Sequence, residues 1–454
     1  MRFKLVEIAA ALAVPVSPLD GPRWAEGWSI DSRTIQAGDV FFALHGENFD
    51  GHQFTQQAFA RGAAAAVVDH ITDGSGCFLR VSDTLAALGR LASWARGQWR
   101  GDVIAVTGSA GKTTTKDITA ALLSASMPVA KTEGNLNNHI GLPLSLLRLP
   151  EEARAAVLEM GMNHAGEIRH LASIARPQVG VVTNVGYAHT ENFASIDDVA
   201  LAKRELIEEL PSNGTAILNA DDERVSKFAA AHRGRVITYG QSESAQIRAV
   251  RVQATATGQS FEVDGSPYKT QLTGKHNLSN ILAGLAVASL YNVEPAKLAV
   301  AVSQLQPGKM RGQRLLHNGV TILNDSYNSN PEAAAAMLEV LRDMPAARRI
   351  AVLGEMLELG AESPRLHAWL GRKAATGSLD VLIGVRGDAI HMVEAARETG
   401  MPAASAIFCG DVKEAGELIA RIARPGDAVL FKASRGVRIE TAMEVFLAAT
   451  GGQS

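Results

Sequence analysis

A glycine-rich turn early in the chain restricts the folds that this sequence can adopt. It follows the apolar run Val103–Val106 and precedes a segment, 112–123, with helical periodicity. Glycines let the backbone turn tightly between a strand and a helix, so that its amides face phosphate oxygens at the positive end of the helix. We expect Lys112 to supply charge to the phosphates of ATP and the Thr113 hydroxyl to reach Mg²⁺. The turn consists of Thr107, Gly108, Ser109, Ala110, Gly111, Lys112, Thr113 and Thr114.

The spacing of this turn is shorter than that of the usual P-loop. In the pattern G-x-x-x-x-G-K-[ST], the first glycine would stand where this chain has Val106, whereas the glycine present is Gly108. A glycine-rich turn that binds nothing is the alternative. The Gly-Lys-Thr-Thr run between a strand and a helix favours ATP binding over that alternative.

Length, charge and cysteine content narrow the class of protein. The 454 residues correspond to about three domains at roughly 150 residues each. The formal net charge of −3 provides no basic surface for nucleic acid. Cys77 and Cys409 are the only cysteines, which excludes a disulfide framework and a cysteine-based zinc site and suits a reducing compartment. Because no apolar run approaches the ~20 residues that span a bilayer, we expect a cytoplasmic protein without membrane insertion.

The first residues have some features of a secretion signal. Arg2 and Lys4 precede the apolar stretch Ile8–Val14, but Glu7 interrupts that stretch. Cleavage after the stretch would leave a leader shorter than the usual ~15–30 residues. A short helix is the interpretation that we favour, because four apolar side chains fall on one helical face. They are Leu5, Ile8, Ala9 and Leu12.

Strand-length apolar runs alternate with helix-length segments over most of the chain. This alternation predicts an α/β fold with mainly parallel sheets. The polar and β-branched stretch Gln246–Gln271 interrupts it and predicts antiparallel strands. We expect three domains, over 1–99, 100–313 and 314–454. The predicted strands are Val103–Val106, Ala155–Leu158, Val179–Thr183 and Ala216–Leu218, followed by Ile350–Leu353, Val381–Val385, Ala406–Phe408 and Ala428–Phe431.

Two polar residues follow predicted strands of the central domain. Glu159 comes directly after Ala155–Leu158, and His189 lies shortly after Val179–Thr183. The carboxyl ends of parallel strands meet at one edge of a sheet, where a carboxylate can reach a Mg²⁺ ion held by phosphates. An ordinary strand-end glutamate and a loop histidine are the alternatives.

Lys203 lies in the middle of an apolar helical stripe. The helix begins after Ser195, which forms a capping signature with Asp198. A lysine that extends its ammonium group to water is one interpretation, and a lysine beside the metal is the other. An ammonium group repels Mg²⁺, so a ligand role requires that the charge be lost or masked. The apolar stripe is Ile196, Val199, Leu206, Ile207 and Leu210.

Together with further motifs in the same order, these residues resemble the Mur ligase family. The resemblance covers essentially the whole chain, and so many motifs in order are far more specific than the phosphate loop alone. The motifs lie at 5–9, 31–33, 38–44, 107–114, 133–138, 158–161, His189, Lys203, 276–280, 309–311 and 325–331.

The resemblance implies three α/β domains and an activity. The three domains are an amino-terminal domain for a UDP-linked substrate, a central P-loop-type ATP domain, and a Rossmann-like carboxy-terminal domain for the incoming amine. It implies a monomeric, ATP-dependent ligase that joins D-alanyl-D-alanine to a UDP-linked muramoyl tripeptide through an acyl phosphate, in peptidoglycan precursor synthesis. Related ligases for a charged diamino acid carry arginine after Asn-Pro, where this chain has Glu332 after Pro331.

The resemblance also implies roles for individual residues. Lys203 would be carbamylated by CO₂, which turns the cation into a carboxylate-like ligand. Thr113 and Glu159 would hold one Mg²⁺, and His189 with Lys203 a second; Lys112, His189 and Lys203 would be catalytic. The implied ATP contacts outside the loop are Asn280, Arg311 and Asp325, and the implied substrate contacts are Ser32, Arg33, Asn135, Asn137, His164, Asn328 and Asn330.

Plainer interpretations of several of these residues stay open. Asn280 would be an ordinary polar helix residue, Arg311 a solvated loop charge, and Asp325 a turn residue. Three other functions also remain: a folylpolyglutamate synthase, a P-loop ATPase that acts as a switch or motor, and a non-catalytic nucleotide-binding scaffold. The first is disfavoured by the Asp31–Arg33 region, which resembles a uridine-binding domain that this synthase lacks.

Overall fold

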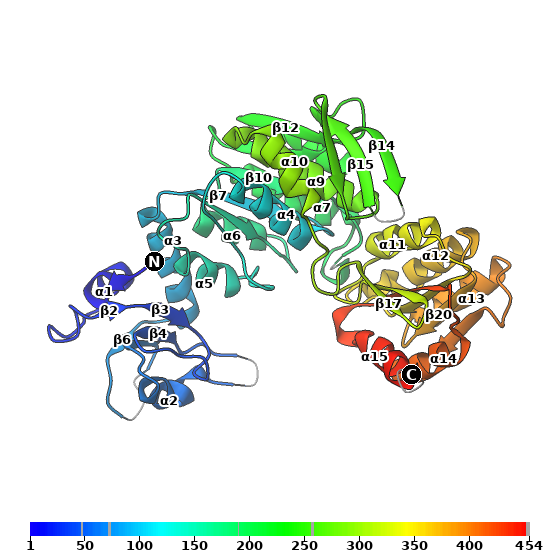
Figure 1. The fold of residues 1–454 in the computed structure, drawn as a ribbon. Helices are drawn as coiled ribbons and strands as arrows, with labels where there is room; N and C mark the ends of the chain where they lie inside the picture. The colour runs from blue at the N-terminus through cyan, green and yellow to red at the C-terminus, as the bar shows by residue number, and fades with distance from the viewer. Residues whose placement is uncertain (47–48, 71–73, 189, 256–257, 451–454) are drawn as a thin grey trace.

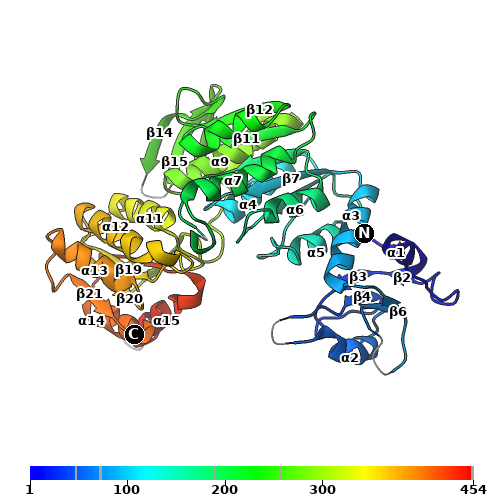
Figure 2. The ribbon, with the colours of Figure 1, turned by 180° about the vertical axis from the view of Figure 1, so that it is seen from behind.

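The computed structural model describes residues 1–46, 49–70, 74–188, 190–255 and 258–450. The chain forms three α/β units, each around its own parallel or mainly parallel sheet. Figure 1 shows the first unit in blue and the third in yellow to red on opposite sides of the central unit, and the reverse view in Figure 2 shows the same arrangement. The predicted α/β fold with three units is confirmed.

The first unit holds a four-stranded parallel sheet in the order β3-β4-β5-β6. The predicted amino-terminal helix is α1, and its four predicted apolar side chains are all buried. The short strands β1 (Phe3–Lys4) and β2 (Trp24–Ala25) pair beside it. The other elements are β3 (Gly27–Ser29), β4 (Asp39–Phe42), a 3₁₀ helix (Gly51–Phe54), α2 (Thr55–Ala60), β5 (Ala65–Val68), β6 (Phe78–Arg80) and α3 (Thr84–Gln98), with α1 at Leu5–Leu12.

The central unit is a seven-stranded parallel sheet in the order β13-β12-β11-β10-β7-β9-β8. All four strands predicted here are present, as β7, β9, β10 and β11. The strand bounds are β7 (Asp102–Thr107), β8 (Val129–Lys131), β9 (Ala155–Glu159), β10 (Val179–Val182), β11 (Thr215–Asn219), β12 (Arg235–Gly240) and β13 (Ile247–Arg248). The helices are α4 (Lys112–Ser124), α5 (Gly141–Leu147), α6 (Glu167–Ala175), α7 (Ile196–Glu208), α8 (Glu223–Ser226), α9 (Lys275–Ala288) and α10 (Pro295–Ser303).

Most of the stretch 246–271 forms the predicted antiparallel strands. These are β14 (Val250–Thr255), β15 (Gly258–Val263) and β16 (Ser266–Thr270). The prediction was wrong for its first residues, because β13 pairs in parallel with β12 through Tyr239 and Ile247. That pairing extends the large sheet by one strand before the chain leaves it.

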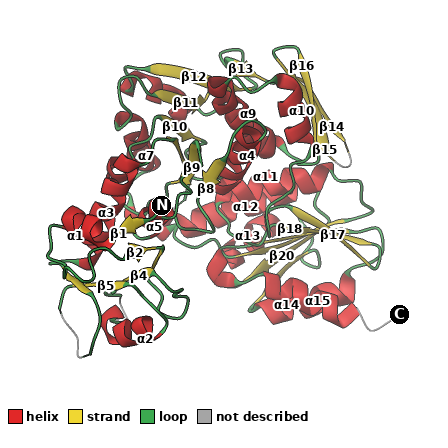
Figure 3. Ribbon diagram, turned by 60° about the vertical axis from the view of Figure 1, so that its left-hand side comes forward, coloured by secondary structure: helices red, strands yellow, loops and turns green. Residues whose placement is uncertain are grey.

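The third unit contains a six-stranded sheet in the order β17-β18-β22-β19-β20-β21. Only the edge strand β17 is antiparallel to its neighbour, and the four predicted strands are present as β19 to β22. Figure 3 shows its helices packed around the strands. The strands are β17 (Gln313–His317), β18 (Val320–Asn324), β19 (Arg349–Gly354), β20 (Val381–Val385), β21 (Ala406–Cys409) and β22 (Ala428–Lys432), and the helices are α11 (Pro331–Asp343), α12 (Ser363–Thr376), α13 (Ala389–Glu398), α14 (Val412–Ile422) and α15 (Glu440–Thr450).

The first and central units share one continuous apolar core. Leu88 and Leu91 of α3 belong to the same buried cluster as Leu146 of α5 and Leu171 of α6. Burial of apolar surface is the main favourable contribution to folding, so this shared core fixes the first unit against the central sheet.

Within the described residues, no helix combines the length and the apolar character that crossing a membrane requires.

Candidate active site

The phosphate loop lies at the carboxyl end of β7, an interior strand of the seven-stranded sheet. Gly108 and Gly111 have φ angles of 148° and 80°, which are rarely open to residues with a side chain. A Cβ atom at Gly108 would lie 1.9 Å from the Thr183 hydroxyl, and one at Gly111 would lie 2.6 Å from the Asn280 side-chain oxygen. Both positions therefore require glycine for the close approach of neighbouring elements as well as for the turn.

The segment after β10 holds this loop in place. The Ala110 amide donates to Asn184 Oδ1 at 2.8 Å, and Asn184 Nδ2 donates back to the Ala110 carbonyl at 3.0 Å. The Thr183 hydroxyl donates to the same carbonyl at 2.7 Å, and the Ser109 hydroxyl donates to the Gly186 carbonyl at 2.9 Å. Asn184 was not among the residues predicted from the sequence, although it directly follows the predicted strand Val179–Thr183.

Asn184→Ala should weaken nucleotide binding. The substitution removes the side-chain acceptor of the Ala110 amide and one of the two side-chain donors to its carbonyl, which should lower the free energy of unfolding by about 1–3 kcal/mol. Titration calorimetry with ADP should give a dissociation constant at least about tenfold higher, since a misplaced loop loses charge-assisted bonds to phosphate. Asn213→Ala, in an exposed loop, is the matched control. Equal affinity of both variants would show that Asn184 does not shape the loop.

Lys112 is the first residue of α4, and its ammonium group remains at the loop. Lys112 Nζ donates to the Gly108 carbonyl at 2.6 Å. Burial lowers the pKa of Lys112, and the Glu159 carboxylate opposes this effect. The fold thus places the Lys112 side chain at the glycine-rich turn, where the sequence predicted a positive charge.

Glu159 ends β9, and its carboxylate accepts one hydrogen bond from the phosphate loop and one from Asn137. Its Oε2 accepts from the Thr113 hydroxyl at 2.7 Å, and its Oε1 accepts from Asn137 Nδ2 at 2.8 Å. Its side chain is only 3% exposed. A hydroxyl and a carboxylate that already touch are the oxygen donors that Mg²⁺ prefers, so these residues fit the metal that the family implies. Arg311 Nη2 also reaches the Thr113 hydroxyl, at 3.2 Å.

Lys203 is buried on α7 with an exposed fraction of 1%. The side chain does not extend to water, so the snorkelling interpretation is wrong. Among the residues that the structure describes, none makes a hydrogen bond or ion pair with its ammonium group. Burial first, and the positive charge of Lys112 second, lower the pKa of Lys203 well below its usual value. His189, the other predicted ligand on this side, lies outside the described residues.

The predicted ATP residues of the later chain fall into two groups. Asn280 on α9 accepts a hydrogen bond from Thr115 of α4 at 3.1 Å, and Arg311 stacks 3.8 Å above the Tyr327 ring while reaching Thr113. Both are thus beside the loop. Asp325 instead forms an ion pair of 2.5 Å with Lys432, and in the described part of the chain its side chain makes no hydrogen bond to the loop.

The start of α11 docks the third unit onto the central unit. Asn330 caps this helix and donates through Nδ2 to the Ser109 carbonyl at 3.3 Å. Glu332 Oε1 accepts from the Tyr187 amide at 2.9 Å, whereas Oε2 is buried without a partner. Burial raises the pKa of the Glu332 carboxyl. In the sequence, Glu332 stood out only as the residue after Asn-Pro, and the residues beside it gave no sign of its contact with the Tyr187 amide.

The remaining predicted substrate residues lie apart from the loop. Ser32 donates to Gln57 at 2.8 Å, and the exposed Arg33 pairs with Asp31 and lowers the pKa of that carboxyl to about 2. Asn135 is exposed, and its carbonyl accepts from the Asn137 amide. His164 pairs with Glu167 at the surface, and Asn328 accepts at its carbonyl from Lys432 and at its side chain from the Arg435 amide. Of the predicted substrate contacts, Asn137 and Asn330 are the two that reach the loop or Glu159.

An α/β unit that presents a glycine-rich loop beside an acidic strand end defines a class of nucleotide-phosphate-binding proteins. Three models of protein-family domains match the chain and narrow this class to one family. The Mur ligase family catalytic domain matches residues 25–93, the Mur ligase middle domain matches 106–288, and the Mur ligase glutamate ligase domain matches 310–435. With the relatives described next, these matches show that the chain belongs to the Mur ligase family.

Named relatives and solved structures resemble the chain over nearly its whole length. The UDP-N-acetylmuramoyl-tripeptide–D-alanyl-D-alanine ligase of Synechocystis sp. is 37% identical, over 92% of this chain and 91% of that protein. The ligase of the same name from Escherichia coli K12 is 38% identical, over 82% and 83%. A crystal structure of MurF from Acinetobacter baumannii has a TM-score of 0.91 at 30% identity and covers 99% of both chains. MurF ligase from Thermotoga maritima in complex with ADP has a TM-score of 0.85 at 31% identity, with 95% and 99% covered.

Proposed function

We propose that this chain is an ATP-dependent ligase that joins D-alanyl-D-alanine to UDP-N-acetylmuramoyl-tripeptide in peptidoglycan precursor synthesis. The observation that carries this proposal is the meeting of Lys112, Thr113 and Glu159 at one sheet edge, with Arg311 and Asn330 contributed from the later chain. The relatives that share this architecture carry the name of this activity.

The chemistry explains why such a site is needed. A carboxylate and an amine do not condense in water, because hydroxide is a poor leaving group. In the first step a carboxylate oxygen of the tripeptide bonds to the γ-phosphorus of ATP, and the bond from that phosphorus to the β–γ bridging oxygen breaks, which releases ADP. The amine of the dipeptide then attacks the carbonyl carbon, phosphate leaves with its oxygen, and the amine loses a proton. Both reactants of the first step are anionic, so Lys112 stabilises the charge that develops during transfer.

We propose that Thr113 and Glu159 hold one Mg²⁺ and that His189 with Lys203 holds a second. Mg²⁺ bound there would offset the charge of the phosphates. Burial lowers the pKa of Lys203, so the side chain retains the neutral amine that CO₂ requires. Addition of CO₂ forms a nitrogen–carbon bond with loss of one proton and gives an anionic carbamate on Lys203. The carbamate removes the repulsion that an ammonium group would exert on a cation.

The substrate sites follow the three units, with the limits 1–99, 100–313 and 314–454 retained as part of this proposal. Ser32 and Arg33 would contact the uridine nucleotide of the UDP-linked substrate. The peptide part of that substrate would contact Asn135, Asn137 and His164. The dipeptide would lie beside Asn328 and Asn330 of the third unit. Asn280, Arg311 and Asp325 would contact ATP.

A phosphate-release assay with each component omitted in turn tests the proposal. Turnover should require ATP, Mg²⁺, a UDP-linked muramoyl tripeptide and D-alanyl-D-alanine together. Phosphate release with ATP alone would indicate a P-loop ATPase, and nucleotide binding without turnover under any condition would indicate a scaffold. Either result would overturn the ligase assignment.

Closure of the third unit over ATP is a further expectation. An acyl phosphate hydrolyses when exposed to water, so the enzyme must exclude water while the intermediate exists. Small-angle scattering should therefore give a smaller radius of gyration with a non-hydrolysable ATP analogue and UDP-linked tripeptide than without them. The same radius in both samples would contradict closure.

A further inference from the structure

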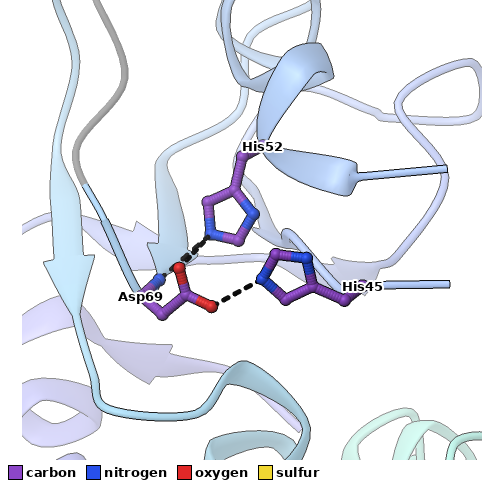
Figure 4. Close-up of side chains that lie close together, drawn as sticks. All are labelled: His45, His52 and Asp69. Carbon is purple, nitrogen blue, oxygen red and sulfur yellow. Dashed lines mark hydrogen bonds and ion pairs between the residues drawn. The ribbon is translucent and has the colours of Figure 1, made fainter.

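Three histidines and two aspartates gather at the carboxyl edge of the first sheet, away from the phosphate loop. His45 follows β4, and Asp69 and His70 follow β5. Asp50 and His52 come from the connection between β4 and α2, where Asp50 caps the 3₁₀ helix. Figure 4 shows the side chains of His45, His52 and Asp69 converging from three segments. In open sheets of parallel strands, this edge is where ligands bind.

His52 is held in one orientation at the centre of this cluster. Its side chain is 1% exposed, and its Nδ1 lies 2.7 Å from Asp50 Oδ1. Its Nε2 accepts a hydrogen bond from the Asp69 amide at 3.1 Å. The Asp50 carboxylate therefore holds the proton on Nδ1, and the lone pair of Nε2 points toward Asp69. Metal-binding histidines are oriented in the same way, by a carboxylate that accepts from the second ring nitrogen.

Two further ligand atoms lie close to that lone pair. His45 Nε2 is 2.7 Å from Asp69 Oδ2, and His52 Nε2 is 3.3 Å from Asp69 Oδ1. One ligand atom from each of His45, His52 and Asp69 can be chosen so that all three lie within 4.8 Å of one another. Ligands at zinc distances of about 2.0–2.2 Å in a tetrahedron stand roughly 3.3–3.5 Å apart, so small side-chain movements suffice to enclose an ion.

The cluster is open to solvent on the side of His45, and His70 contacts the Asp69 carboxylate. The His45 side chain is 55% exposed and that of Asp69 is 23% exposed, so the site opens to solvent on one side. His70 stacks on His52 with ring centroids 4.2 Å apart, and its Nδ1 lies 2.5 Å from Asp69 Oδ1. The fixed histidine is thus at the back of the site, and the adjustable one is at its mouth.

We propose that His45, His52 and Asp69 bind one divalent cation of the zinc class, oriented by Asp50. Two imidazoles and one carboxylate suit Zn²⁺, Cu²⁺ or Ni²⁺, whereas Mg²⁺ prefers oxygen donors alone. The site is therefore separate from the oxygen donors Thr113 and Glu159, and it adds a metal site that the ligase reaction does not need. On binding, the ion takes the place of the Asp69 amide proton at His52 Nε2. A hydrogen-bonded cluster that holds no ion is the competing interpretation.

Equilibrium dialysis of the full chain against Zn²⁺ tests the proposal. Excess Mg²⁺ in the buffer occupies the oxygen-donor sites, and bound zinc is counted by mass spectrometry. The wild-type chain should hold one more zinc than His45→Gln, whose zinc affinity at this site should be at least about tenfold weaker. His391→Gln is the matched control, because His391 also pairs with a carboxylate, Glu394, at the surface. It should bind zinc as the wild type does.

Thermal unfolding gives a second and independent readout. Zn²⁺ should raise the Tm of the wild type and of His391→Gln but not that of His45→Gln, because a ligand that binds only the native state stabilises it. Asp69→Asn serves in the same comparison if His45→Gln fails to fold. Equal zinc content and equal Tm shifts in the wild type and in whichever site variant folds would overturn the proposal and leave a hydrogen-bonded cluster only. Loss of the zinc in His391→Gln would overturn it as well.

Discussion

Lys112→Ala should reduce kcat by about 10³-fold, the size of effect seen when one preorganised group that stabilises developing charge is removed. Lys112 lies at the start of α4 with its Nζ at the loop, 2.6 Å from the Gly108 carbonyl. In the part of the chain that the structure describes, no other lysine forms a hydrogen bond or ion pair with the loop, so no other ammonium group is placed to substitute for it. The measurement is the steady-state rate of phosphate release with all substrates present.

The control for this prediction separates catalysis from folding. Lys131→Ala removes an exposed lysine that pairs with Asp117, and it should keep wild-type turnover. The free energy of unfolding of Lys112→Ala should change by no more than about 1 kcal/mol, since only one hydrogen bond is lost. Wild-type turnover in a folded Lys112→Ala protein would remove Lys112 from phosphoryl transfer.

Lys203→Met should abolish turnover while making the metal-free protein more stable. The amine of Lys203 is buried, and no hydrogen bond or ion pair from the described residues satisfies it. Replacement by an apolar side chain of similar length removes the cost of burying that amine, which should raise the free energy of unfolding by about 1–3 kcal/mol. Urea denaturation in metal-free buffer depleted of CO₂ measures this change. A less stable variant would mean that the lysine has a partner in solution.

Rescue distinguishes a carbamate from a simple structural lysine. Lys203→Ala leaves space where a small carboxylate can bind, so added bicarbonate or short carboxylic acids should restore part of the turnover. The same acids should leave Lys112→Ala inactive, because they supply no positive charge. Full turnover of Lys203→Ala without any addition would exclude Lys203 from the metal site.

The parts of the fold that the sequence predicted are those governed by local periodicity. The apolar face of α1 and the position of Lys203 within the apolar stripe of α7 both follow from residue spacing along a single helix. The place of Glu159 at the sheet edge follows from its position directly after an apolar strand. Neighbouring residues decide such features, so a single sequence is enough to find them.

The parts that could not be predicted depend on segments far apart in the chain. Asn184 bonds to Ala110, and Glu332 bonds to the Tyr187 amide across two units. Neither contact has a signature in the residues beside it, because each is created by the packing of whole elements. The pairing of β13 with β12 was missed for the same reason, since a two-residue strand has no pattern of its own. The cluster around His52 likewise appears only once β4 and β5 lie side by side.

The central claim is that ATP hands its terminal phosphoryl group to the peptide carboxylate beside Lys112 and Glu159. Oxygen-18 placed in the terminal carboxylate of the UDP-linked tripeptide follows that transfer directly. If an acyl phosphate forms, the carbon–oxygen bond breaks when the dipeptide amine attacks, and each phosphate released during ligation carries one labelled oxygen. Mass spectrometry of the phosphate should therefore find one label for each peptide bond formed. Phosphate without label, released alongside ligated product, would contradict the mechanism.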